Sequence, residues 1–332
     1  MLVYILKRIL QGLFVVFGVI LLIFIIIRVI PGDPARLIAA GGATPESIEK
    51  IRRELGLDRP VAIQFADYVV QVAKGDLGNS IFRSKGGSTH HGVHKFVTDS
   101  ERTDVVEYEK AEVLNLILER IPLTLLLSGM AVLFALIIAG SLGIMSALKP
   151  ETVWDKIATF ITIATQSLPN FWVGIVLILI VSVKLKILPA MGYRNFSYSI
   201  LPSFALSLSL IPIWLRIIRL GLIDVLSSNF ITGLRARGIP RGKILFKHAL
   251  RNAAIPFVTI LSVHLGYLLG GAIIIEFVFD YPGLGLLTIV GVLQRDFTVV
   301  QGIVVFFASI FVLINILIDI IYVYIDPRIS LE

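Results

Sequence analysis

The chain has 332 residues, of which 56% are hydrophobic and 16% charged, and its formal net charge is +7. A typical soluble domain is about 45–50% apolar and about 25% charged, so this composition excludes an ordinary soluble enzyme and a disordered or fibrous chain. Cysteine is absent, which excludes a disulfide framework, a thiol nucleophile and a cysteine-based metal site. Because the apolar residues form long unbroken blocks, the sequence predicts a membrane protein.

The first apolar block predicts a retained transmembrane helix over residues 9–30. Lys7 and Arg8 precede this block, and Pro31-Gly32-Asp33-Pro34 end it. Its length matches the ~20 residues that cross a bilayer core. A signal peptide has a shorter apolar region followed by a small-residue cleavage site, so the block is interpreted as an anchor.

The same spanning length, applied along the chain, predicts an all-α polytopic membrane protein with six transmembrane helices. They are expected at about 9–30, 122–148, 157–186, 200–223, 253–276 and 302–325. The third is too long for one straight span and contains Pro169, which removes a backbone hydrogen bond. We interpret it as one kinked span, with two short helices meeting at Pro169 as the alternative.

The distribution of charge predicts the orientation. No acidic residue lies between Leu226 and Asn252. The basic residues of that stretch are Arg235, Arg237, Arg241, Lys243, Lys247 and Arg251. Positively charged loops remain in the cytoplasm, so this loop, Lys7 and Arg8 are predicted to be cytoplasmic, as are both termini. The net positive charge therefore indicates orientation and does not argue for nucleic acid.

Residues 31–121 are then predicted to form an extracytoplasmic insertion between the first two spans. An amphipathic helix is expected to begin at Pro45 and to end at Gly56, and a second helix is expected at about 61–74. The polar stretch 82–112 has no periodicity and predicts a surface loop. The predicted organisation is a transmembrane helix (1–30), this segment (31–121) and a five-helix core (122–332) with a cytoplasmic loop at 225–252.

The cytoplasmic loop 225–252 has the pattern of two amphipathic helices separated by Gly238-Ile239-Pro240. Apolar residues such as Phe230 and Leu234 lie on otherwise basic helices. Helices this short do not hold their shape alone. Two interpretations stay open: a basic loop that orients the protein or touches anionic lipid, or a docking element for a soluble partner.

This loop resembles the coupling loop of ABC-importer permeases, in the branch that imports peptides, nickel chelates and related solutes. The likeness rests on Leu234-Arg235-Ala236-Arg237-Gly238 and on His248-Ala249-Leu250-Arg251-Asn252-Ala253, followed by Pro256. The loop departs from the family at its start, where Thr232-Gly233-Leu234 replaces Glu-Ala-Ala. Only the glycine of the general signature remains.

Further motifs resemble the same branch in the same order along the chain. They are Pro31-Gly32-Asp33-Pro34, Gly75-Asp76-Leu77-Gly78-Asn79-Ser80-Ile81, Arg120-Ile121-Pro122-Leu123-Thr124-Leu125, Ser167…Pro169…Phe171, Glu276…Phe279…Tyr281-Pro282-Gly283-Leu284-Gly285, Arg295-Asp296-Phe297 and Asp326-Pro327-Arg328. The stretch at about 82–112 departs, because it is longer and more polar than expected of the family.

The resemblance implies that the chain works within a complex. The expected partners are a second homologous permease in a heterodimer, two cytoplasmic ATPases docked on the coupling loops, an external solute-binding protein and membrane lipid. ATP and Mg²⁺ would bind the ATPases, with no cofactor and no catalytic residue in this chain. The sequence agrees on this point, since it contains no Gly-x-x-x-x-Gly-Lys-Ser/Thr phosphate loop.

Two groups of candidate site residues follow. The coupling group is Arg235, Ala236, Arg237, Gly238, Ile239, Pro240, Lys243, Phe246 and His248. The translocation pathway or gate group is Gln166, Ser167, Pro169, Asn170, Phe171, Glu276, Phe279 and Tyr281. Gln166, Ser167 and Asn170 around Pro169 either line a path for a polar solute or form helix–helix hydrogen bonds. Glu276, an acid at a membrane helix end, forms an outer gate with Phe279 and Tyr281 or belongs to a structural turn.

Three histidines lie close together in the polar stretch. His90, His91 and His94 are residues that suit nickel, copper or zinc, but their neighbours are Gly, Ser and Thr and no carboxylate spacing completes a site. No metal site is predicted. His264 is expected to be a satisfied interhelical residue.

The predicted function is that of a permease subunit of an ATP-driven importer of di- or oligopeptides. Nickel or other metal chelates and oligosaccharides are the alternative solutes within this class. An ion-coupled secondary transporter is the alternative of another class, and it would need coupling carboxylates in broken helices together with an inverted repeat.

Overall fold

The computed structural model describes residues 2–29, 44–54, 56–84 and 110–325. The chain forms two compact units, one of Met1–Arg120 with Leu287–Glu332 and the other of Ile121–Leu286. The boundaries between the units fall within two helices, α5 (Val113–Leu148) and α13 (Leu284–Leu293). The two units differ from the predicted segments 1–30, 31–121 and 122–332. The units are defined by which residues pack together, whereas the segments were divided at the expected membrane crossings.

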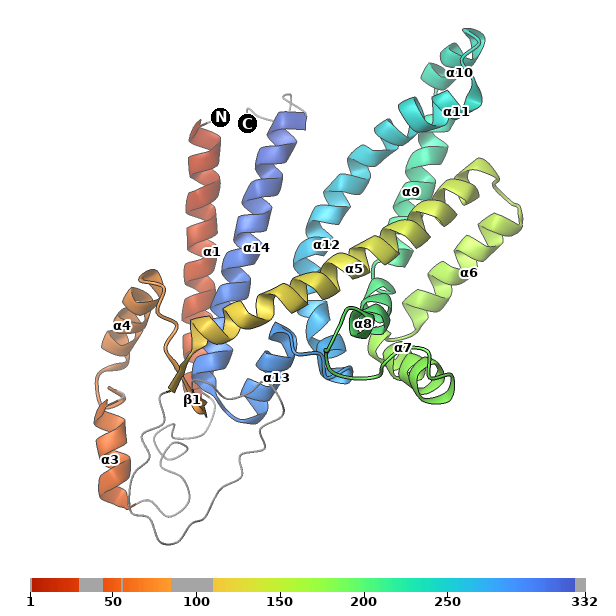
Figure 1. Cartoon of the computed structure of the whole chain (residues 1–332). Helices are drawn as coiled ribbons and strands as arrows, with labels where there is room; N and C mark the ends of the chain where they lie inside the picture. Colours follow the sequence, from red (N-terminus) through yellow and green to blue (C-terminus); the bar gives the residue numbers. More distant parts are fainter. Residues whose placement is uncertain (1, 30–43, 55, 85–109, 326–332) are drawn as a thin grey trace. The chain divides into compact units, whose positions relative to one another are not determined.

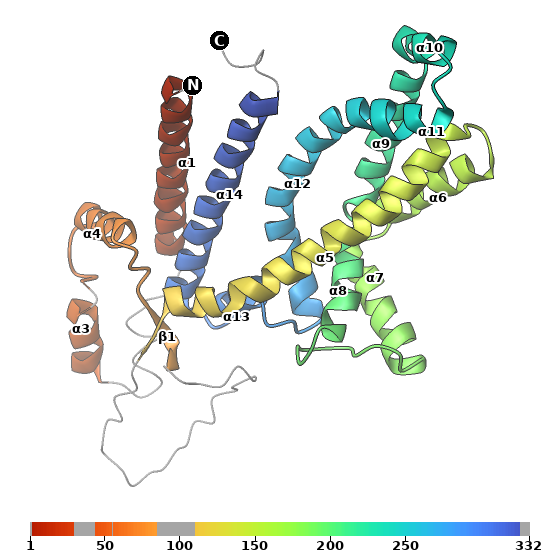
Figure 2. The same cartoon turned by 45° about the horizontal axis from the view of Figure 1, so that its top comes forward.

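The first unit contains a pair of long helices, α1 (Leu2–Val29) and α14 (Phe297–Ile325), which lie side by side in both views (Figure 1, Figure 2). The beginning of α1 and the end of α14 lie at the same end of this pair. A glycine permits the close approach, since a Cβ at Gly12 would lie 2.5 Å from Cγ1 of Val312. The first and last predicted spans therefore form one antiparallel pair.

The two helices predicted after the first span are confirmed as α3 (Pro45–Glu54) and α4 (Val61–Ala73). Gly56 and Gly75 follow them with φ of 62° and 83°, a region that glycine adopts without the steric cost of a Cβ. Phe65 of α4 packs edge-on against two phenylalanines of α1, with ring centroids 5.8 and 5.1 Å apart.

The chain is mostly helical, as predicted, and it also contains a two-stranded antiparallel sheet that the sequence analysis does not predict. Strand β1 (Asn79–Ser84) pairs with β2 (Lys110–Glu112), so that Asn79 faces Glu112 and Ser84 faces Lys110, with an irregularity between. The surface loop predicted from residue 82 therefore begins and ends in strand. Local periodicity does not reveal this pairing, because the partners are far apart in sequence. Residues 85–109 lie outside the described ranges.

Membrane-spanning helices are confirmed. Within the described residues, three helices are long and apolar enough to cross a membrane, at Leu6–Val29, Val113–Leu148 and Phe297–Leu317. Two bent helix pairs raise this number to five if each pair is one span. The remaining predicted span, 253–276, lies within α12 (Leu250–Val278), a single helix of 29 residues.

The third predicted span is two helices and not one kinked helix. Helices α6 (Val153–Ser167) and α7 (Asn170–Leu177) meet at an angle of 99°. The π-helix η1 (Ile178–Lys184) continues α7. Leu168 is extended, with φ −107° and ψ 129°, because the ring of Pro169 disfavours the helical conformation for the residue before it. The alternative reading at Pro169 is the one observed.

The fourth predicted span is also broken. Helices α8 (Ser197–Ser207) and α9 (Ile211–Leu226) meet at 60°. Pro212, in the first turn of α9, has no N–H for the carbonyl of Leu208, and its ring would clash with that carbonyl. One helix therefore ends before Leu208 and another begins after it.

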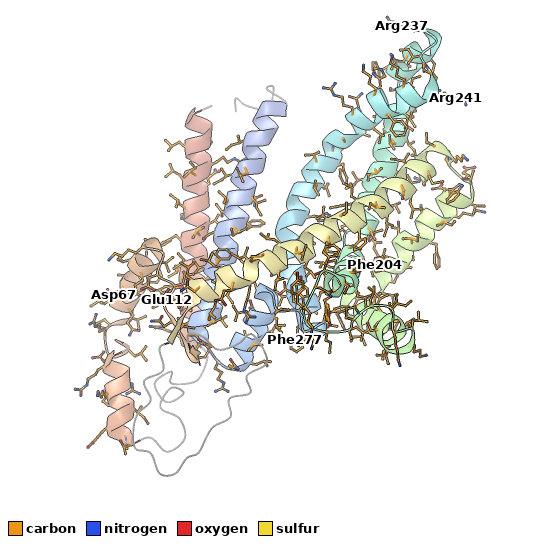
Figure 3. All side chains as sticks on the ribbon, in the orientation of Figure 1. Asp67, Glu112, Phe204, Arg237, Arg241 and Phe277 are labelled. Atoms are coloured by element: carbon orange, nitrogen blue, oxygen red, sulfur yellow. The ribbon has the colours of Figure 1, made fainter. Side chains whose placement is uncertain are left out.

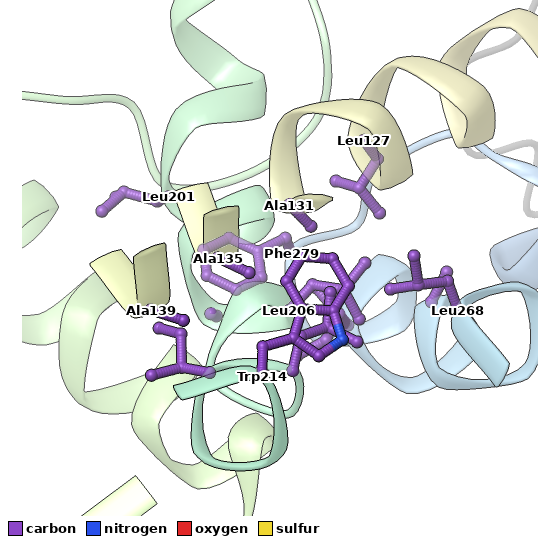
Figure 4. Packing of buried hydrophobic residues seen from close by; sticks show 14 of the residues in the cluster. Leu127, Ala131, Ala135, Ala139, Leu201, Leu206, Trp214, Leu268 and Phe279 are labelled. Atoms are coloured by element: carbon purple, nitrogen blue, oxygen red, sulfur yellow. The ribbon is translucent and has the colours of Figure 1, made fainter. Parts of the chain in front are cut away.

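The core of the second unit is built on a row of one leucine and three alanines along α5. Leu127, Ala131, Ala135 and Ala139 recur every four positions on one helix face and are fully buried (Figure 4). Leu206, Trp214, Leu268 and Phe279 belong to the same cluster. Trp214 Nε1 donates to Nδ1 of His264 at 2.7 Å, which confirms the interhelical hydrogen bond expected for that histidine.

Candidate functional site

The acid-free stretch between α9 and α12 folds into helical segments, as predicted. We call residues 229–249 the basic element. It contains α10 (Asn229–Ala236), α11 (Arg241–Lys243) and the π-helix η2 (Ile244–Ala249), which leads directly into α12 (Figure 1). The two predicted amphipathic helices and the break between them are thus observed.

The break is a Schellman turn centred on Gly238. The N–H of Gly238 donates to the carbonyl of Arg235 at 3.0 Å, and that of Ile239 donates to the carbonyl of Leu234 at 3.3 Å. Gly238 has φ 75°, the left-handed conformation that this turn requires. Ile239 packs in the same apolar cluster as Leu234, so the glycine has a defined backbone role.

One face of the basic element is buried. Ile231, Leu234 and Ile244 are at most 8% exposed. They pack on a group that we call the supporting cluster, which consists of Ala147 of α5, Ile218 and Leu222 of α9 and Ala253 of α12. Because short helices are unstable alone, this packing onto three long helices is what holds the element in shape.

The opposite face of the basic element combines aromatic and basic side chains. Phe230 is 51% exposed and Phe246 is 71% exposed. Figure 3 shows Arg237 and Arg241 at the tip of the element. The exposed cations are Arg235, Arg237, Arg241, Lys243 and Lys247. Exposed aromatics among arginines are typical of protein–protein binding sites.

The predicted coupling residues divide between the two faces. The exposed members are Arg235, Ala236, Arg237, Gly238, Pro240, Lys243 and Phe246, whereas Ile239 and His248 are half-buried. Phe230 is not among the predicted coupling residues, although it contacts His248 ring to ring at 6.1 Å. A signal existed, because the helical period that buries Ile231 and Leu234 places Phe230 off the buried face.

The second candidate site is the turn that follows α12. The carboxylate of Glu276 is fully buried. Its Oε1 accepts from the hydroxyl of Thr124 at 2.7 Å, and its Oε2 accepts from the N–H groups of Gly285 at 2.6 Å and Leu286 at 3.1 Å. Thr124 Oγ1 accepts from the N–H of Leu284 at 2.9 Å. The two side chains together cap the first turn of α13.

Two glycines make room for this carboxylate. A Cβ at Gly283 would collide with the carboxylate of Glu276, and a Cβ at Gly285 would collide with the backbone of Ile273. The Tyr281-Pro282-Gly283-Leu284-Gly285 motif is therefore a tight turn around Glu276. In this structure the carboxylate is engaged in the turn, which agrees with the structural interpretation; its role as a gate stays a prediction.

Phe279 and Tyr281 lie in the core of the second unit. They are 1% and 0% exposed. The hydroxyls of Tyr281 and Ser199 are 3.0 Å apart, and a Cβ at Gly174 of α7 would lie 3.0 Å from the ring of Phe279. Both aromatic residues thus fix the end of α12 against α7 and α8.

The five predicted pathway residues near Pro169 meet at the break between α6 and α7. Gln166, Ser167, Pro169 and Phe171 are exposed, and Asn170 is half-buried. The hydroxyl of Ser167 donates to the carbonyl of Ile163 at 2.8 Å within its own helix. The structure therefore brings these five together at one break and places Glu276, Phe279 and Tyr281 at the turn after α12.

In the first unit, two of the remaining motifs meet. The hydroxyl of Ser80 donates to Oδ2 of Asp296 at 2.6 Å, and Oδ1 of Asp296 accepts from the N–H of Val299 at 3.3 Å, at the start of α14. Gly78 has φ 81°, and a Cβ there would lie 2.8 Å from Cγ2 of Thr298. The motif at 75–81 is thus anchored on the N-terminus of α14.

Among the residues that the structure describes, no group of three His, Cys, Asp or Glu side chains is placed to hold a metal ion. His90, His91 and His94 lie outside those residues.

Two protein-family models match the chain. The model described as "Binding-protein-dependent transport system inner membrane component" matches residues 139–331, and the corresponding N-terminal model matches residues 1–86. The chain is 35% identical over 329 residues to the glutathione transport system permease protein GsiC of Escherichia coli O6:H1, covering 99% of both chains. It is 34% identical, with the same coverage, to GsiC of Escherichia coli strain K12.

A solved structure shares the fold. A chain of the MetNI methionine ABC transporter in an inward-facing conformation matches with a TM-score of 0.54 at 19% identity. The match covers 64% of this chain and 96% of that one. It shows that the helices adopt the fold of an ABC-transporter permease.

Proposed function

The chain belongs to the family of inner membrane components of binding-protein-dependent transport systems, and from this premise we propose that it forms half of the translocation pathway of an ATP-driven importer of di- or oligopeptides. It is a transmembrane permease subunit and not the ATPase. ATP and Mg²⁺ would bind two partner ATPase subunits. A solute-binding protein outside the membrane would deliver the peptide.

The observation that carries this proposal is the two-faced basic element. One face is held by the supporting cluster, and the other presents Phe230 and Phe246 among five exposed cations. Cations and exposed phenylalanines also suit a lipid surface, but the packing of this element on three long helices favours a folded protein partner, because it ties the element to the membrane helices. An ATPase surface with an apolar recess and acidic rim suits this face. Movement of the ATPases would then reach α9 and α12 through the supporting cluster.

Six spans fit the described helices. Helix α12 would be the sixth span, since its 29 residues exceed the ~20 needed to cross a bilayer, and each bent pair would count once. The adjacent ends of α1 and α14 agree with both termini on one side. By the positive-inside tendency, the basic element would lie in the cytoplasm, and Lys7 near the start of α1 would place both termini there as well. Part of the segment 31–121 would then face outward.

The assembly would be a heterodimer of this chain with a second homologous permease. The large exposed apolar side chains of the membrane helices, such as Phe14 at 78% and Phe160 at 71% exposed, leave ample area for lipid and for the second subunit. We infer a peptide as the solute of this chain, because its relatives are glutathione permeases and glutathione is a tripeptide. Metal chelates and oligosaccharides are the competing solutes.

Reconstitution tests the function. The chain is inserted into liposomes with the partner permease, the ATPases and the binding protein, and uptake of labelled glutathione, a dipeptide, a nickel chelate and an oligosaccharide is measured with and without ATP. We expect peptide uptake that requires ATP and all subunits. Uptake by the isolated chain under a proton or sodium gradient would establish a secondary transporter instead, and uptake of the chelate or sugar alone would replace the substrate class.

A further inference from the structure

A partly buried charged cluster joins three helices of the second unit and belongs to neither candidate site. Arg219 of α9 donates from Nε to Oδ1 of Asp155 at 2.8 Å and from Nη2 to Oδ2 at 3.0 Å. The same Nε lies 2.9 Å from Oγ of Ser146 on α5, whose hydroxyl also donates to Asp155. The side chains of Arg219 and Asp155 are 29% and 13% exposed. We call these three residues the Arg219 cluster.

The geometry is that of a strong, directional contact. A two-pronged arginine–carboxylate pair fixes both groups in one plane, and lysine cannot reproduce it. Asp155 receives a further N–H from Glu151 at 3.1 Å, which holds the carboxylate at the start of α6. Partial burial distinguishes this contact from an exposed surface pair, whose contribution is small.

The Arg219 cluster adjoins the support of the basic element. Ser146 and Arg219 are the chain neighbours of Ala147 and Ile218, and both of those residues belong to the supporting cluster. A displacement of the basic element that moves the supporting cluster must therefore move Arg219. Asp155 is the member that brings α6 into this set.

Helix α6 packs on the apolar core through Ala158 and Ile161, and its Asp155 accepts hydrogen bonds from Arg219 of α9. Ala158 is its only buried residue, on a helix whose side chains are all described. Val153, Phe160 and Ile163 are 68%, 71% and 58% exposed. At its far end α6 reaches the break that carries Gln166 and Ser167. The contact with Arg219 is thus the polar attachment of α6 to the helix that supports the basic element.

We propose that Asp155 and Arg219 are positioning residues that transmit movement of the basic element to α6 and to the break at residues 167–170. This inference rests on the proposed function, because it assumes that ATPases move the basic element. It does not assign either residue to solute or nucleotide binding. The ion pair is a rigid connection through which a rearrangement of the basic element would reach the break at residues 167–170.

The test uses Asp155→Asn in the complete reconstituted transporter, with solute transported per ATP hydrolysed as the readout. We expect this ratio to fall at least tenfold while ATP hydrolysis and the amount of inserted protein stay near wild type. The charge-exchanged double variant D155R/R219D should restore at least half of the ratio. Arg216→Ala is the matched control, since Arg216 lies exposed on the same helix, without an ion pair in the described part of the chain.

A second measurement separates transmission from simple loss of structure. Because the chain has no cysteine, spin labels at Thr159→Cys and Leu220→Cys report the distance between α6 and α9. We expect a narrow distance distribution in the parent chain and a broad one with Asp155→Asn. If that variant fails to insert, Arg219→Lys replaces it, and an intermediate ratio is expected.

A wild-type transport ratio in Asp155→Asn, or in Arg219→Lys where it is used, overturns the proposal. So does a ratio that falls equally with Arg216→Ala. Absence of ATP-dependent uptake by the parent complex would overturn the proposed function instead, and the spin-label distances would still show whether Asp155 holds α6 to α9.

Discussion

At the scale of single residues, the turn of the basic element depends on the backbone of Gly238. Its φ of 75° costs a residue with a Cβ about 1–2 kcal/mol. We expect Gly238→Ala to lower the ratio of transport to ATP hydrolysis by up to about tenfold without reducing the inserted protein. Gly242→Ala is the control, because a Cβ at Gly242 meets no atom within 4 Å. Equal losses in both variants would contradict this assignment.

Replacing Glu276 should lower the stability of the folded chain. Glu276→Ala would leave the N–H groups of Gly285 and Leu286 without their acceptor, and each buried unsatisfied donor costs about 1–3 kcal/mol. We therefore expect a clear fall in the thermal unfolding midpoint of the detergent-solubilised chain. Glu119→Ala, at an exposed position, should leave the midpoint unchanged. An unchanged midpoint in Glu276→Ala would show that the turn does not depend on the carboxylate.

The sequence identified Glu276 as a candidate but not its contacts. Its partner Thr124 lies 152 positions away in the chain, and neither motif alone indicates that they meet. Gly238 was identified within its motif, whereas its Schellman turn became visible only with the hydrogen bonds. Phe230 had a readable signal in the helical period that places it off the buried face.

At the scale of elements, the exposed face of the basic element should bind the ATPase through its aromatic residues. Phe246→Ala is expected to weaken ATPase association at least tenfold, because aromatic residues dominate binding energy at such sites. Association is measured by titrating purified ATPase onto the permease in nanodiscs. Phe160→Ala is the matched control, since Phe246 and Phe160 are both 71% exposed. Unaltered affinity in Phe246→Ala would remove that residue from the docking surface.

Elements whose ends are marked by glycine or proline in the sequence were predictable, whereas elements that depend on distant partners were not. Helices α3 and α4 are bounded by Gly56 and Gly75, which any reader of the sequence can locate. The break at Pro169 was expected as a kink, and the comparable effect of Pro212 was overlooked. The strands were missed because β1 and β2 pair across a long intervening stretch.

At the scale of the whole molecule, the orientation can be tested with introduced cysteines. In a chain without native cysteine, Lys243→Cys in the basic element and Asp58→Cys after α3 are both at exposed positions. We expect a membrane-impermeant maleimide to label Asp58→Cys in intact cells and Lys243→Cys only after permeabilisation, because basic loops stay inside. Labelling of both variants in intact cells would contradict the proposed topology.

Composition and charge predicted that the chain is a membrane protein, because apolar blocks of about 20 residues match the length that crosses a bilayer core. The division into two compact units was not predicted. It depends on the first and last helices packing together, as at Gly12 and Val312, and such long-range packing leaves no periodic trace in either helix.

The short sheet has a consequence for engineering the chain. Because Ser84 and Lys110 are paired, the two ends of the intervening stretch are held at neighbouring positions whatever its length. Doubling the length of a flexible loop costs only about 0.6 kcal/mol of closure entropy. A fluorescent protein or an affinity tag inserted between these strands should therefore leave the fold intact, which makes this point a natural handle for following the assembled transporter in living cells.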